Sequence, residues 1–88
     1  MRKAQKLKRL NEHYALVAAI RPYLAGHGPE LQSSVLADLV AIWLCGHQGG
    51  TEDELMEARA ELLCQFLKLV MELVPVNERI LREARLLH

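Results

Sequence analysis

The chain has 88 residues, the size of one domain and close to the smallest size at which a single hydrophobic core stabilises a fold. Hydrophobic residues make up 51% of it and charged residues 25%, a balance that excludes an intrinsically disordered tail. Its formal net charge is zero, so the whole molecule has no general attraction for nucleic acid.

Residues 1–9 are basic and precede the first helical pattern. Apolar residues then recur every three or four positions, and Asn11 suits the position before a helix begins. We therefore predict a helix over residues 10–24 after a loosely ordered segment 1–9; one helix from about Lys3 onward is the alternative. No apolar stretch of a secretory signal follows, so we expect a cytoplasmic protein. The five bases of the segment are candidates for contact with phosphate or with an acidic partner: Arg2, Lys3, Lys6, Lys8 and Arg9.

The rest of the chain is expected to pack around residues 29–45. Pro29 suits the first position of a helix, and Gly46 suits its end. Apolar residues occupy two faces of this helix, so it needs two neighbours. The wholly apolar run over residues 39–45 is far shorter than the ~20 residues that cross a bilayer. We expect this helix to be the most buried one, with Leu39, Ile42 and Trp43 in the core.

The next helix opens on the clearest local signature of the chain. Thr51 and Glu54 have the spacing of a capping box, in which each side chain binds the backbone amide of the other residue. The apolar pattern that follows predicts a helix over residues 52–74, which should end before Pro75 because proline disfavours helical geometry in the residue that precedes it.

The last predicted helix covers residues 77–87, with Asn77 as its N-cap. Pro22 is expected to stop or kink the first helix, and Gly26 to form a left-handed cap after it. The predicted fold is therefore all-α: a small four-helix bundle, or three helices plus a short C-terminal helix, in one domain over residues 10–88.

Four residues are of types that bind zinc: His27, Cys45, His47 and Cys64. They lack the second regularly spaced pair of a structural zinc site, so we interpret the cysteines as core residues and the histidines as loop surface. No cofactor or metal is predicted. No Ser/His pair or pair of carboxylates is spaced for catalysis, so we do not expect an enzyme.

Asp38 is the one charged residue within an otherwise apolar stretch. A carboxylate in such a place either lies on an exposed strip, forms an ion pair, or makes a polar contact in an interface. Arg21 and Arg59 are the candidate ion-pair partners.

The sequence favours a small regulatory module that binds a protein partner through an apolar helical surface. Bacterial adaptors and anti-activators share this short, neutral, all-helical format, although no motif identifies a family. A homodimer is also expected, because apolar surface exceeds what four short helices cover. The alternative is a nucleic-acid-associated accessory protein that uses its basic N-terminal segment; direct nucleic-acid binding is not favoured, and no membrane span is expected. The candidate partner-binding residues are Asp38, Trp43, Phe66, Leu81, Arg82 and Leu87.

Overall fold

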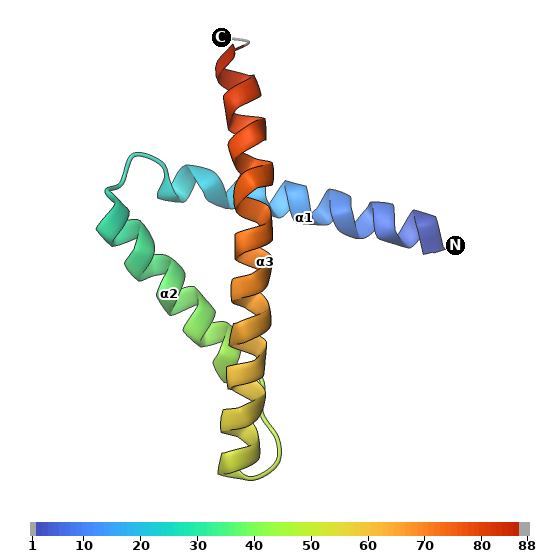
Figure 1. Ribbon diagram of the computed structural model, residues 1–88, viewed down its shortest axis with the longest axis vertical. Helices are drawn as coiled ribbons and strands as arrows, with labels where there is room; N and C mark the ends of the chain where they lie inside the picture. Colours follow the sequence, from blue (N-terminus) through green and yellow to red (C-terminus); the bar gives the residue numbers. More distant parts are fainter. Residues whose placement is uncertain (1, 87–88) are drawn as a thin grey trace. The chain divides into compact units, whose positions relative to one another are not determined.

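The computed structural model describes residues 2–86, with Leu86 described by its backbone only. It contains three helices, α1 (Arg2–Leu24), α2 (Pro29–Cys45) and α3 (Glu52–Leu86), and no strand within the described residues (Figure 1). The all-α prediction is confirmed. The prediction of a fourth helix is wrong, since its residues continue α3 without a break.

The chain divides into two compact units, Met1–Asp38 and Leu39–His88, so that α2 contributes to both. In the first unit, α1 already begins at Arg2. Residues 2–9 are therefore helical, where we had expected a loosely ordered segment. Lys, Arg, Ala, Gln and Leu are all strong helix formers, and together they outweigh the capping preference of Asn11, which lies inside the helix.

The end of α1 is closed by its own backbone and by one side chain. Pro22 is accommodated inside the last turn, and the helix ends at Leu24. Gly26 follows with a φ of 82°, the left-handed conformation predicted for the cap. The side-chain amide of Gln32 donates a 2.8 Å hydrogen bond to the carbonyl oxygen of Leu24. A residue of α2 thus satisfies a carbonyl at the end of α1.

In the second unit, α3 begins as the capping motif predicts. The amide of Glu54 donates to the hydroxyl oxygen of Thr51 over 3.2 Å, and the amide of Leu55 donates to the Thr51 carbonyl over 2.9 Å. The predicted end before Pro75 is wrong, because α3 continues to Leu86. A long helix retains its other backbone hydrogen bonds when proline removes one donor. Because α3 contains many strong helix formers, it continues past the proline.

Asn77 consequently lies inside α3 and does not cap a new helix. Its side-chain amide donates to the carbonyl oxygen of Leu73, four residues earlier, over 2.9 Å. This bond provides an additional donor close to the place where Pro75 lacks one.

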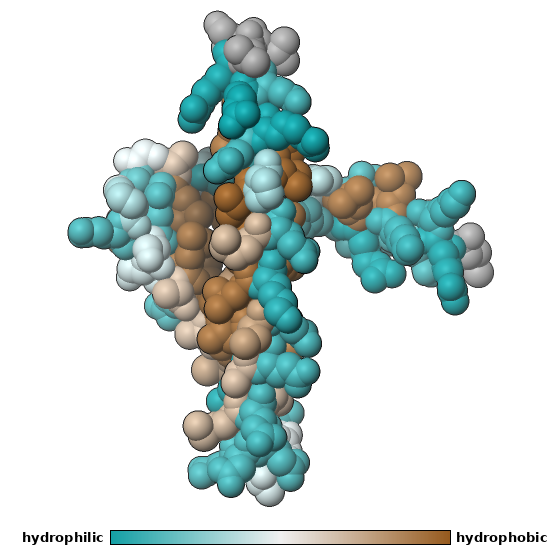
Figure 2. Space-filling model, viewed as in Figure 1, coloured by the Kyte–Doolittle hydropathy of each residue, from teal (hydrophilic) through white to brown (hydrophobic). Residues whose placement is uncertain are grey.

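No described residue is buried, and this overturns the predicted core. Leu39, Ile42 and Trp43 are 50%, 63% and 40% exposed. In the space-filling view, apolar side chains cover the middle of α3 and hydrophilic ones cover both of its ends (Figure 2). Only eight described residues are half-buried: Leu24, Gln32, Val40, Leu44, Leu55, Arg59, Leu62 and Phe66.

Candidate interaction surface

Three aromatic rings meet where the last turns of α2 approach α3. The Trp43 and Phe66 ring centroids are 5.7 Å apart, with their planes tilted by 42°. The His47 ring meets Trp43 edge-on, at a centroid distance of 5.3 Å and an interplanar angle of 82°. Both distances fall in the range in which aromatic pairs attract one another. We call Trp43, His47 and Phe66 the aromatic cluster.

The turn after α2 holds His47 against this cluster. The amide of Gly46 donates to the Ile42 carbonyl, and the amide of His47 donates to the Leu44 carbonyl, each over 3.1 Å. The imidazole Nδ1 of His47 lies 2.9 Å from the Trp43 carbonyl oxygen. A carbonyl only accepts hydrogen bonds, so Nδ1 carries the proton and donates it in this bond.

Arg59 of α3 closes the C-terminal end of α2. Its Nε donates to the Leu44 carbonyl over 3.1 Å, and one terminal nitrogen donates to the His47 carbonyl over 3.4 Å. The last turn of α2 has no basic residue of its own. Arg59 therefore supplies both the hydrogen-bond donors and the positive charge that a helix C-terminus favours.

These contacts fix one side of Trp43 and leave another open. Val40 and Leu44 of α2 and Leu55 and Leu62 of α3 are half-buried, whereas Trp43 keeps 40% of its surface exposed. Within the aromatic cluster, Trp43 is therefore held by its neighbours on one side and exposed on another. An aromatic side chain in this situation is typical of the residues that anchor protein interfaces.

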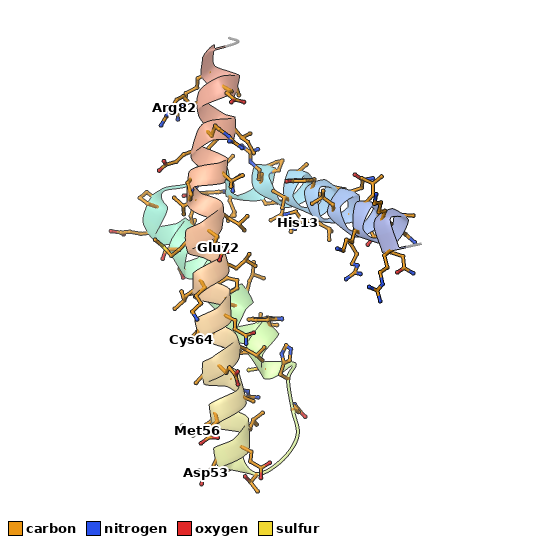
Figure 3. The ribbon with its side chains drawn as sticks, turned by 45° about the vertical axis from the view of Figure 1, so that its right-hand side comes forward. His13, Asp53, Met56, Cys64, Glu72 and Arg82 are labelled. Atoms are coloured by element: carbon orange, nitrogen blue, oxygen red, sulfur yellow. The ribbon has the colours of Figure 1, made fainter. Side chains whose placement is uncertain are left out.

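Of the predicted partner-binding residues, the structure brings only Trp43 and Phe66 into contact. Asp38 is exposed on α2, and five residues of helix separate it from Trp43, so the two side chains point about 140° apart around the axis. Leu81 and Arg82 lie fifteen or more residues beyond Phe66 along α3, where Figure 3 shows Arg82 far from Cys64. Leu87 lies outside the described residues.

The exposed position of Asp38 agrees with the first of its alternatives, the exposed strip, and the guanidinium of Arg59, one of the two candidate ion-pair partners, binds carbonyls at the end of α2. Sequence reasoning missed the roles of Arg59, Gln32 and His47. A signal was present for Arg59, the single base among the acids at the start of α3.

All five bases of the N-terminal segment are exposed and lie on the first turns of α1: Arg2, Lys3, Lys6, Lys8 and Arg9. The helix spaces their charges at a rise of about 1.5 Å per residue, so they form a compact basic segment.

The two cysteines, Cys45 and Cys64, are free and exposed. Their assignment to the core is wrong for the same reason as that of Trp43: the neighbouring helices leave them uncovered. Among the described residues, no three His, Cys, Asp or Glu side chains gather closely enough to hold a metal ion.

Within the part of the chain that the structure describes, no helix combines the length and the apolar character that a membrane span needs. No protein-family model matches the chain, and no curated protein or solved structure is significantly similar to it.

Proposed function

We propose that this chain is a small regulatory protein–protein interaction module of the adaptor or anti-activator type. Its partner is a protein that covers part of the apolar helical surface. The observation that supports this proposal is that every large apolar side chain of the described residues retains exposed surface and none is buried. Extended apolar surface on a small protein is typical of an interaction site.

Within this surface, Trp43 is the proposed anchor. Tryptophan is among the residues that contribute most to binding when they are supported by neighbours and freed from water. Phe66 and His47 support the indole, and its remaining face is free to enter a partner's pocket. The proposed activity is binding without catalysis.

The test begins with capture of the partner from the native host and continues with the purified partner by calorimetry. We expect Trp43→Ala to weaken binding by tenfold or more, because it removes the anchor. Tyr23→Ala is the matched control, since Tyr23 is an aromatic residue that is 78% exposed and belongs to the other unit. Equal binding by the wild type and Trp43→Ala, with helical content unchanged, would contradict the proposal.

A second candidate function is suggested by the basic segment of α1. Its exposed bases are suited to neutralising phosphates, which predicts an accessory role on nucleic acid. In a gel-shift titration, this function predicts binding that falls steeply with salt and is lost when residues 1–9 are removed. Binding that persists after this truncation, or no shift even at low salt, would exclude it.

A further inference from the structure

α3 carries a second apolar row, distinct from the half-buried one beside α2. The half-buried residues Leu55, Arg59, Leu62 and Phe66 follow one side of the helix. The second row advances in alternating steps of four and three residues, the repeat of helices that pair along their length. Every member of this row is exposed: Met56, Ala60, Leu63, Leu67, Val70, Val74, Asn77, Leu81 and Ala84.

The polar position in this row does not prevent pairing. Asn77 already donates its side-chain amide to the Leu73 carbonyl, so the amide is not left without a partner if the row is covered. The row spans residues 56–84, about 42 Å of helix.

The charges of α3 differ between its two ends. Residues 52–61 carry five acids and one base, and residues 79–85 carry three arginines and one acid. Figure 3 shows Asp53 and Arg82 near opposite ends of the helix. Glu57 and Arg85 directly follow Met56 and Ala84, the second apolar positions of their heptads, so both lie on the same flank of the row, where paired helices form ion pairs.

We propose that a second copy of this chain occupies the row, with the two α3 helices antiparallel. With Val70 of each copy opposite Val74 of the other, Leu63 meets Leu81, and Glu57 lies beside Arg85. Symmetry gives every contact twice. A parallel pair would instead bring acid against acid at one end and arginine against arginine at the other, which costs free energy.

The pairing goes beyond the proposed function, because it concerns a second copy and a row of α3 that does not include Trp43.

Charge reversal tests the pairing in the full-length chain, with dimerisation followed by sedimentation at low salt. We expect the wild type to dimerise, and Glu57→Arg and Arg85→Glu each to weaken its self-association by about tenfold, since attraction becomes repulsion at two sites. An equimolar mixture of the two single variants should form a heterodimer of wild-type affinity, because every Arg then faces a Glu.

The mixture separates pairing from effects within one helix. Residues 57 and 85 are about 42 Å apart along α3, beyond the ~8 Å Debye length at physiological salt. Restoration on mixing therefore supports contacts between chains. A strictly monomeric wild type, or a dimer whose affinity neither reversal changes, would overturn the proposal.

A second pair of variants tests the apolar row itself. Val70→Glu places a charge at its centre and should prevent dimerisation. Gln65→Glu adds the same charge on the side of α3 that faces away from the row, and should leave dimerisation unchanged. Equal effects of the two variants would overturn the assignment of the row. Binding of the separate partner at Trp43 is measured independently, so failure of the pairing leaves the proposed function standing.

Discussion

Two side chains, Gln32 and Arg59, close the ends of helices that precede them in the chain. Each donates to a carbonyl of the previous helix, eight and fifteen residues back. Neither contact was predicted from the sequence, whereas the Thr51 cap was. A cap formed within one turn is visible as a spacing motif, but a contact over eight or fifteen residues depends on how a loop folds back.

Arg59→Met is expected to lower the free energy of unfolding by about 1 kcal/mol, because it removes charge-assisted hydrogen bonds at a half-exposed position. Arg59→Lys should lose less, since it keeps the positive charge near the end of α2. Urea unfolding at one fixed chain concentration measures both. If the Met variant were as stable as the wild type, Arg59 would not hold the end of α2.

The three helices differ in how far their bounds were predictable. Pro29 and Gly46 gave the bounds of α2, because a proline at a helix start and a glycine after its end act locally. The prediction that the helix of α3 ends before Pro75 was wrong. The free-energy cost of a proline inside a helix competes with the helix propensity of the many residues on both sides of it. A spacing motif does not show which of the two is larger.

Pro75→Ala is therefore expected to stabilise α3 by up to ~3 kcal/mol, because the alanine restores a backbone donor and removes a ring clash inside a continuous helix. Thermal unfolding at fixed concentration should show a higher midpoint. Pro22→Ala, in the last turn of α1, is the control and should give a smaller gain. A fall in stability for Pro75→Ala would indicate that the chain turns at this residue.

Across the whole molecule, periodicity predicted that apolar faces need covering but not what covers them. The sequence analysis assigned that role to other helices of the same chain and so placed Trp43 and Leu39 in a core. The structure leaves both at least 40% exposed. Helical patterns report which side of a helix is apolar, whereas burial depends on which neighbours cover that side.

The most direct test of this conclusion is the thermal midpoint of the full-length chain, measured by circular dichroism over about two orders of magnitude in chain concentration. If association covers the apolar surface, dilution removes stability, and we predict a midpoint that rises steadily with concentration. A cooperative transition at the same temperature throughout that range would contradict it, because the chain would then bury its own apolar surface as a monomer.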